Sequence, residues 1–302
     1  METWINGITH NNMGKPKEKF TNQDINRINE LYVCFDFMCN LHCPHCTLRT
    51  INIDNNLQYV YDTLQFLDER NSKFTINLFG GEPMLLKDEE LKKFENLFNK
   101  HPLIISTNLL VLSRYKISLM KNCEDVNTSW NPQRFSKSQM ELWENNLKII
   151  QNENIPYSVM ITLTKDLIEN YTPQEFCSII GKWKKCRNID LKQMIGDKSI
   201  DFEMVDEWLC NLYDCWNITP KNLLFDEIER VIRKEKIWKN YCESYFTLLP
   251  NGNLKDGCPY FEYKTNKDFC LMCEYYNVCK GGCNIQEKCT FPKKLYEKAK
   301  NR

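Results

Sequence analysis

The stretch LYVCFDFMCNLHCPHC (31–46) places an apolar run directly before three closely spaced cysteines. Its first part, LYVCFDF (31–37), has the composition of a buried β-strand. The loop that follows carries five side chains able to bind metal: Cys39, His42, Cys43, His45 and Cys46. The spacing C-x3-C-x2-C lets one loop surround a compact metal centre. This stretch therefore predicts a strand that ends in a metal-binding loop.

Strand and helix patterns alternate from this stretch to about residue 200. The runs expected as strands are 31–37, 74–79, 103–106, 125–130, 156–163 and 189–195. The runs expected as helices begin near Leu57, Lys87, Leu112, Ser136 and Thr172. Six such units in about 170 residues indicate parallel strands joined by helical crossovers. A doubly wound sheet and an incomplete TIM-like barrel both fit this pattern.

The organisation along the chain suggests four segments. They are a polar N-terminal lead-in (1–29), the alternating α/β part (30–200), a mostly helical bridge (201–238) and a cysteine-rich C-terminal segment (239–302). The last segment has little periodic apolar pattern, yet it contains seven of the sixteen cysteines. Something other than a hydrophobic core must therefore hold it together.

Composition narrows the class of protein. The 302 residues include 40 basic and 40 acidic side chains, so the balance of charge gives no support for nucleic acid as the main ligand. No apolar run resembles a signal peptide or is long enough to span a membrane, and we expect a cytoplasmic protein. In that reducing compartment, sixteen cysteines favour metal or redox chemistry over disulfides.

Two kinds of metal centre fit the first cysteine group. A structural zinc site would take Cys39, Cys43 and Cys46 with either His42 or His45 as the fourth ligand. A cubane iron–sulfur cluster would take the three thiolates and leave one iron open for a further ligand. The spacing alone leaves both readings open.

A second motif favours the cluster. The sequence FGGEP (79–83), with Gly80, Gly81 and Glu82, ends the second expected strand. Together with the cysteine loop, it resembles radical S-adenosylmethionine (SAM) enzymes, whose glycine-rich loop contacts the amino group of SAM. The resemblance implies a partial (β/α)6 TIM-like barrel with its active site at the carboxyl ends of the strands. It also implies that SAM occupies the fourth position of a [4Fe–4S] cluster.

The same resemblance implies further contacts and the reaction. Asn108, Ser129 and Leu163 end the third, fourth and fifth expected strands, where Asn108 and Ser129 would bond SAM and Leu163 would pack on its adenine. His45 would lie beside the adenine, and His42 would be a solvated loop residue. The implied chemistry is reductive cleavage of SAM to methionine and a 5′-deoxyadenosyl radical, which abstracts hydrogen from a substrate.

The C-terminal cysteines form a second group. Their C-x2-C and C-x3-C spacings also occur in zinc ribbons, but seven thiols exceed the need of one zinc ion. The whole pattern resembles the SPASM extension of radical SAM enzymes, which binds auxiliary [4Fe–4S] clusters. One departure is Gly252-x5-Cys258, which is one residue longer than the usual spacing. The resemblance assigns Cys242, Cys258 and Cys283 to the nearer cluster, and Cys270, Cys273, Cys279 and Cys289 to the farther cluster.

The nearer cluster then lacks a fourth cysteine from its own segment. Cys210 or Cys215 could supply it, or one iron could stay open for a substrate group. The six cysteines outside the two groups are expected to be small buried side chains: Cys34, Cys123, Cys177, Cys186, Cys210 and Cys215. The sequence singles out no general base and no hydrogen donor among its other residues.

The resemblance implies an oxidoreductase that modifies a ribosomally made peptide by cross-linking or oxidation. Its electrons would come from a flavodoxin or ferredoxin type of reductant. Because only 29 residues precede the first strand, a leader peptide would dock on the barrel or on a separate binding protein. The alternatives are a radical SAM dehydrogenase of a small molecule and a non-catalytic zinc or redox-sensing protein.

Overall fold

The computed structural model describes residues 25–43, 46, 48, 51, 53–71, 73–193, 201–235, 245–257, 273–275, 278 and 291–302. The chain forms two compact units, and each is described by itself. The first unit comprises residues 1–128, 141–156 and 241–261, and the second comprises residues 129–140, 157–240 and 262–302. No helix in the described ranges is long and apolar enough to cross a membrane.

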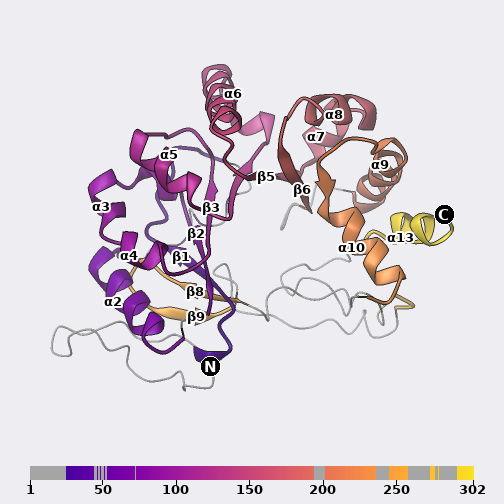
Figure 1. The fold of residues 1–302 in the computed structure, drawn as a ribbon. Coiled ribbons are helices and arrows are strands. Elements are labelled where there is room, and N and C mark those ends of the chain that lie inside the picture. Colours follow the sequence, from indigo (N-terminus) through magenta and orange to yellow (C-terminus); the bar gives the residue numbers. More distant parts are fainter. Residues whose placement is uncertain are drawn as a thin grey trace. The chain divides into compact units, whose positions relative to one another are not determined.

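The first unit contains a mainly parallel sheet with helical connections (Figure 1). Its strands are β1 (Glu30–Cys34), β2 (Thr75–Phe79), β3 (Leu103–Thr107), β4 (Asp125–Ser129, whose last residue belongs to the second unit), β8 (Tyr245–Leu248) and β9 (Leu254–Asp256). Its helices are α2 (Leu57–Asp68), η2 (Pro83–Leu85), α3 (Asp88–Lys92), α4 (Glu95–Phe98), α5 (Arg114–Lys121) and most of α6 (Lys137–Asn152). The strand order is β4-β3-β2-β1-β8-β9, and β9 runs antiparallel to β8.

The two faces of this sheet differ in burial and polarity. Val33, Leu78 and Ile105 occupy one row of the register and are fully buried on one face. Alternate side chains point to the opposite face, as strand geometry requires. We call this opposite face the polar face and define it by five residues: Glu30, Tyr32, Asn77, Ser106 and Asn127. Only Asn77 among these five is buried, and the others are partly exposed.

The hairpin of β8 and β9 adds residues from late in the sequence to the first unit's sheet. Strand β8 pairs in parallel with β1, in register from Glu30 to Val33. Gly252 in the hairpin has a φ of +80°, and a Cβ atom there would lie 2.6 Å from the Cβ of Tyr59 on α2. The Gly252 carbonyl also accepts a hydrogen bond from Thr63 Oγ1 at 2.9 Å. This close approach to α2 explains the glycine at position 252.

The second unit combines three parallel strands with helices (Figure 1). Its strands are β5 (Tyr157–Leu163), β6 (Cys186–Gln193) and β7 (Lys221–Asn222), which pair in that order. Its helices are η3 (Pro132–Arg134), α7 (Lys165–Asn170), α8 (Pro173–Ile180), α9 (Phe202–Cys215), α10 (Leu223–Ile232) and α13 (Lys293–Lys300).

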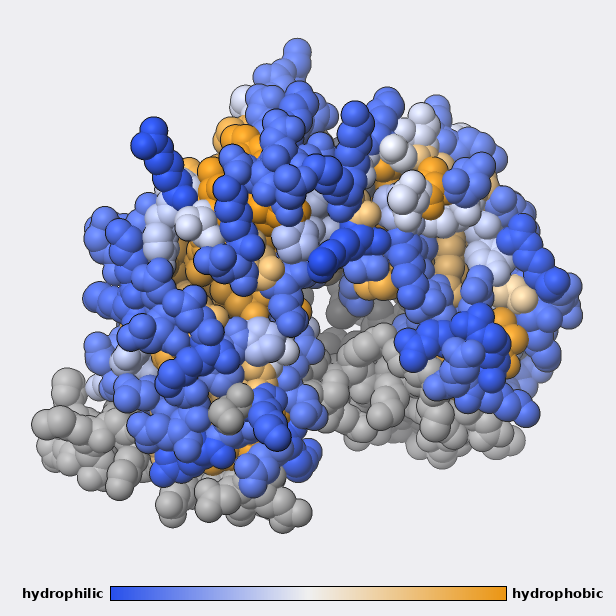
Figure 2. All heavy atoms as spheres, viewed as in Figure 1, coloured by the Kyte–Doolittle hydropathy of each residue, from blue (hydrophilic) through white to orange (hydrophobic). Residues whose placement is uncertain are grey.

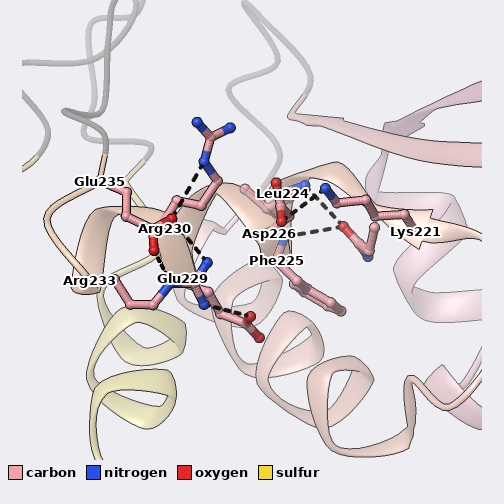
Figure 3. A network of polar contacts seen from close by, with 9 residues as sticks. Lys221, Leu224, Phe225, Asp226, Glu229, Arg230, Arg233 and Glu235 are labelled. Carbon is pink, nitrogen blue, oxygen red and sulfur yellow. Dashed lines mark hydrogen bonds and ion pairs between the residues drawn. The ribbon is translucent and has the colours of Figure 1, made fainter.

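Helix α10 in the second unit is stabilised both by buried apolar side chains and by polar contacts at its ends. Asn222 caps its start by accepting from the backbone N–H groups of Leu224 and Phe225. At its end, Arg233 forms ion pairs with Glu229 and Glu235 (Figure 3). Exposed pairs of this kind contribute about 0–1 kcal/mol each, so the buried apolar side chains of the helix stabilise it most. These side chains are Phe225, Ile228 and Val231.

Several expected elements are confirmed with shifted ends. Residues 87–100 form two short helices, α3 and α4, where the apolar spacing predicted one. The break lies at Phe94, whose ring is buried against Phe35. The centroids of the two rings are 4.9 Å apart. The expected helical bridge is interrupted by β7, and the sixth expected strand starts earlier, at Cys186. Hydrophilic residues cover most of the surface seen in Figure 2, in keeping with a content of 26% charged residues.

Candidate active site

The cysteine loop follows β1 in the first unit. Leu41 and Leu48 anchor it in the core, where each is 3% exposed. Cys39, Cys43 and Cys46 are half-buried, and no disulfide joins them. The backbone N–H of Cys46 donates to the Cys43 carbonyl at 3.1 Å, which bends the chain between these two cysteines. The loop therefore presents three thiols that could serve as metal ligands.

The donor set of this loop fits an iron–sulfur cluster. Among the described residues, no three His, Cys, Asp or Glu side chains converge on a point that could hold one metal ion. Each thiolate of a cubane cluster binds a different iron atom, so three cluster ligands need not converge on one point. Thiolates are also the soft ligands that such clusters require. His42 is exposed, while His45 lies outside the described residues.

The two glycines after β2 lie directly against the cysteine loop. The backbone N–H of Gly81 donates to the Asp36 carbonyl at 3.0 Å, and the N–H of Glu82 donates to the Met38 carbonyl at 2.8 Å. A Cβ atom on Gly81 would lie 2.0 Å from the Met38 carbonyl oxygen. Gly80 has a φ of +125°, and a Cβ there would lie 2.8 Å from the Asp36 carbonyl oxygen. Both glycines are therefore needed for the glycine loop and the cysteine loop to pair.

Glu82 joins the carboxyl ends of β2 and β3. Its side chain is buried and accepts from the backbone N–H of Met84 at 3.0 Å. It also accepts from Thr107 Oγ1 at 2.7 Å and from the backbone N–H of Asn108 at 2.6 Å. Three donors compensate for much of the cost of burying this carboxylate. Glu82 thus holds the expected third-strand residue Asn108 next to the glycine loop.

Asn108 reaches from the end of β3 to the cysteine loop. Its Nδ2 atom donates to Asn40 Oδ1 at 2.6 Å and to Cys39 Sγ at 3.7 Å. Leu109, which follows it, has a φ of +61°, in the left-handed region that glycine adopts most readily. This chain nevertheless has a fully buried leucine at the position.

Burial dominates the electrostatics of Cys39. It raises the pKa of this thiol, and the nearby Glu82 and Cys43 raise it further. Hydrogen bonds from the Leu41 N–H and the Asn108 amide act in the opposite direction, because they stabilise the thiolate. These two donors therefore lie where a thiolate ligand at Cys39 would need them.

The structure brings Gly80, Gly81, Glu82 and Asn108 together with the cysteine loop in the first unit. The other two predicted SAM contacts, Ser129 and Leu163, belong to the second unit. Arg134 Nη2 donates to the hydroxyl and the carbonyl oxygens of Ser129, both at 2.6 Å. Leu163 is fully buried at the end of β5. Sequence reasoning missed Arg134, although an arginine five residues after Ser129 on the same loop could have been noticed.

Sequence reasoning also missed the polar face and its hydrogen bonds. Ser106 Oγ donates to Asn77 Oδ1 at 3.1 Å, and Asn77 Nδ2 donates to Glu30 Oε1 at 3.2 Å. Asn127 is opposite Ser106 in the register, and its buried Oδ1 atom has no hydrogen-bond partner among the described residues. The signal in the sequence was the alternation of polar and apolar residues in these strands, because every second residue of a strand points to the same face.

The second cysteine group lies mostly outside the described residues. This applies to Cys242, Cys258, Cys270, Cys279, Cys283 and Cys289, whereas Cys273 is described and half-buried. Cys34, Cys123, Cys177 and Cys186 are buried, as expected of small core side chains. Cys210 and Cys215 are half-buried on α9.

Comparison with known proteins gives a structural likeness and no likeness in sequence. No protein-family model and no curated protein matches the chain. The structure of anSMEcpe with bound AdoMet and Cp18Cys peptide aligns with a TM-score of 0.70 and 16% identity, covering 89% of this chain and 95% of that chain. Streptococcus suis SuiB bound to S-adenosylmethionine aligns with a TM-score of 0.57 and 13% identity, covering 85% of this chain and 73% of that chain.

A second SuiB structure, bound to the precursor peptide SuiA, aligns with a TM-score of 0.57 and 14% identity, covering 85% of this chain and 72% of that chain. AdoMet is S-adenosylmethionine, so structures of both proteins hold SAM. The likeness confirms the predicted α/β fold.

Proposed function

We propose that the chain is a radical SAM enzyme that modifies a ribosomally made peptide. The observation that carries this proposal is the pairing of the cysteine loop with the glycine loop, in a fold shared with two SAM-bound proteins. Three thiols, a pair of glycines without space for side chains, and the buried Glu82 converge at the carboxyl ends of β1 and β2. Parallel α/β folds bind their ligands at such strand ends.

Cys39, Cys43 and Cys46 would hold the [4Fe–4S] cluster. Once bound there with SAM, the cluster would supply the electron that cleaves SAM to methionine and the 5′-deoxyadenosyl radical. Asn108 keeps Cys39 in place through its amide, and Glu82 keeps Asn108 in place through its backbone. We also propose that Gly80, Gly81 and Glu82 border the amino group of SAM, that Ser129 binds its carboxylate or ribose, and that Leu163 packs on its adenine.

The C-terminal cysteines would hold two auxiliary [4Fe–4S] clusters in a SPASM domain. The ligand set follows the resemblance stated above, with Cys242, Cys258 and Cys283 on one cluster and Cys270, Cys273, Cys279 and Cys289 on the other. A chain with three clusters would need a flavodoxin or ferredoxin type of electron donor. We place the enzyme in the cytoplasm, where such donors and reduced thiols coexist.

The proposed substrate class rests on the two structural neighbours and on the polar face. AnSMEcpe is bound to the Cp18Cys peptide and SuiB to the precursor peptide SuiA. In this chain, the polar face is in the same unit as the cysteine loop. Asn127 is partly exposed, and its Oδ1 atom has no hydrogen-bond partner among the described residues. Rotation of the side chain would turn this buried acceptor toward a peptide N–H group. We propose that the polar face holds the peptide backbone.

The experiment uses iron-loaded protein under anaerobic conditions, with SAM, a strong reductant and a short peptide encoded beside the gene. Formation of 5′-deoxyadenosine together with a peptide mass lower by two hydrogen atoms is the expected result. Deoxyadenosine without any change in the peptide would favour the alternative small-molecule substrate. Protein that purifies anaerobically with zinc and without iron would instead support the non-catalytic zinc protein.

A variant tests the polar face separately. Asn127→Leu keeps the size of the side chain and removes the acceptor, so we expect the KM for the peptide to rise about tenfold, the effect of about 1.4 kcal/mol. Cleavage of SAM without peptide should remain within a factor of about two. Asn99→Leu, an exposed site after α4, is the control. An unchanged KM would remove Asn127 from the substrate site.

A further inference from the structure

Two thiols meet in the second unit between α8 and α9. The Sγ atoms of Cys177 and Cys215 are 3.6 Å apart, and no disulfide joins them. Cys177 Sγ also lies 3.6 Å from the backbone oxygen of Cys215. We infer that Cys177 and Cys215 form a redox-active dithiol that low-molecular-weight disulfides oxidise to an intramolecular disulfide. This inference does not depend on the proposed function.

The packing of the two helices holds the thiols in contact. Phe176, next to Cys177, packs edge-on against Trp208 of α9 with ring centroids 5.1 Å apart. Trp208 Nε1 donates to the Tyr171 carbonyl just before α8 at 2.9 Å. A disulfide needs an S–S distance of about 2.0 Å, so the sulfur atoms must approach each other by roughly 1.5 Å. Rotation about the Cα–Cβ bonds is the movement that would bring the two sulfur atoms together.

The two thiols differ in access, and this sets the order of reaction. Cys177 is buried, whereas Cys215 is half-buried at the last residue of α9. Burial, together with the adjoining Cys215 thiol, raises the pKa of Cys177 to about 12. A thiol that is buried and protonated is a poor first nucleophile. Cys215 therefore reacts with the external disulfide, and Cys177 reacts second.

The reaction is a balanced thiol–disulfide exchange. The Cys215 thiolate attacks one sulfur of glutathione disulfide, an S–S bond forms between Cys215 and glutathione, and one glutathione thiolate leaves. The Cys177 thiol then loses its proton and attacks the Cys215 sulfur, which releases the second glutathione. The protein dithiol is oxidised by two electrons, and glutathione disulfide is reduced to two glutathione molecules.

The test incubates the anaerobic, iron-loaded full chain with mixtures of glutathione and glutathione disulfide. Free thiols are then alkylated, and the digested protein is mapped by mass spectrometry. We expect a peptide pair joined through Cys177 and Cys215, at a fraction that rises with the proportion of glutathione disulfide. Absence of this cross-link at every ratio would overturn the inference, as would a stable glutathione adduct on Cys215 in the unaltered chain.

Single variants separate the two roles. Cys177→Ser should accumulate glutathione on Cys215, because the second step is missing, whereas Cys215→Ser should leave Cys177 unmodified. Cys123→Ser, in the first unit and outside both cysteine groups, is the control and should cross-link like the unaltered chain. If Cys215→Ser instead loses iron, Cys215 is a cluster ligand and the dithiol assignment is wrong.

Discussion

At the scale of single residues, the space left at Gly81 decides whether the two site loops pair. A methyl group there would overlap the Met38 carbonyl, which is the acceptor for the Glu82 N–H. We predict that Gly81→Ala displaces the cysteine loop and lowers 5′-deoxyadenosine formation about 100-fold, the loss expected from a displacement of about 1 Å. Deoxyadenosine yield and iron content, measured on the same anaerobic samples, check this prediction.

The control for this variant is Gly181→Ala. Gly181 ends α8 with a φ of −60°, and its Cβ would lie 3.2 Å from the nearest atom, the Cys177 carbonyl oxygen. A small adjustment accommodates it, so activity should stay close to that of the unaltered chain. Equal activities of the Gly81→Ala chain and the unaltered chain would mean that the pairing of the loops does not position the cysteines.

Some residues of the first-unit site could be predicted from the sequence, whereas the contacts between them could not. The cysteines and glycines could be found because motif spacing is local in sequence. The role of Glu82 could not, because its partners Thr107 and Asn108 come from the next strand and are brought close only by the parallel register. The backbone conformation of Leu109 could not be predicted either. Leucine rarely adopts a positive φ, yet the fold places Leu109 in the left-handed region.

At the scale of elements, polar contacts of the partly exposed Asp68 join the end of α2 to Lys100 and His101, just before β3. Asp68 accepts from Lys100 Nζ at 2.7 Å and from His101 Nε2 at 3.1 Å, while His101 Nδ1 is 3.1 Å from the Phe74 carbonyl oxygen. The buried imidazole of His101 thus bridges the Asp68 carboxylate and the Phe74 backbone. Burial works against the Asp68 charge, but these hydrogen bonds outweigh it and lower the pKa of Asp68.

A carboxyl pKa that is lower in the folded state stabilises the fold above the unfolded value, about 3.9, and this contribution is lost as pH falls through the folded value. We predict that Asp68→Asn lowers the free energy of unfolding by about 1–3 kcal/mol at neutral pH. The difference from the unaltered chain should shrink as pH falls below about 4. Urea denaturation followed by tryptophan fluorescence at several pH values provides the measurement.

Glu69→Gln is the matched control for Asp68→Asn, because it removes the same charge from the next residue. Glu69 is exposed and pairs only with Arg70 among the ion pairs of the described chain, at 3.9 Å. Its loss should change the free energy of unfolding by less than about 1 kcal/mol. A difference between Asp68→Asn and the unaltered chain that stays constant with pH would contradict the lowered pKa of Asp68.

Helix α13 depends on a cap supplied by another element. The residue before it, Pro292, makes no side-chain cap, and Asp206 of α9 accepts from the N–H groups of Lys294 and Leu295 at 2.7 and 3.0 Å. We predict that Asp206→Ala speeds hydrogen exchange of residues 293–300 about tenfold, because a lost cap costs about 1 kcal/mol or more. Hydrogen exchange followed by mass spectrometry measures this directly.

Glu207→Ala gives the comparison for Asp206→Ala. Glu207 forms an exposed ion pair with Lys294 at 2.8 Å. An exposed pair contributes little, so exchange in α13 should change by less than about threefold. Equal effects of the two variants would show that surface charge, rather than the buried cap, holds α13.

At the scale of the whole molecule, the fold class could be predicted because strands and helices leave different spacings of apolar residues in the sequence. These two spacings alternate along the chain. The six expected parallel strands are present in the two units. The β8–β9 hairpin was not predicted, since its partner β1 is more than 200 residues earlier in the chain. The short strand β7 was missed because two residues are too few to show an alternation of polar and apolar side chains.

In the proposed enzyme, three of the sixteen cysteines bind the cluster that cleaves SAM, and one assay can separate their role from that of the other cysteines. Replacing Cys39, Cys43 and Cys46 together by alanine should abolish cleavage of SAM and leave the iron of the C-terminal clusters in place. A double variant of two buried cysteines outside both groups, Cys123→Ala with Cys186→Ala, serves as the control. It should keep both the iron content and the cleavage of SAM.

Anaerobic formation of 5′-deoxyadenosine from SAM, with iron counted in the same samples, is the most direct measurement. The predicted result is deoxyadenosine from the unaltered chain and from the control, and none from the triple variant, which retains part of its iron. Deoxyadenosine from the triple variant, or none from an iron-loaded unaltered chain, would contradict the assignment of Cys39, Cys43 and Cys46 to a SAM-cleaving cluster.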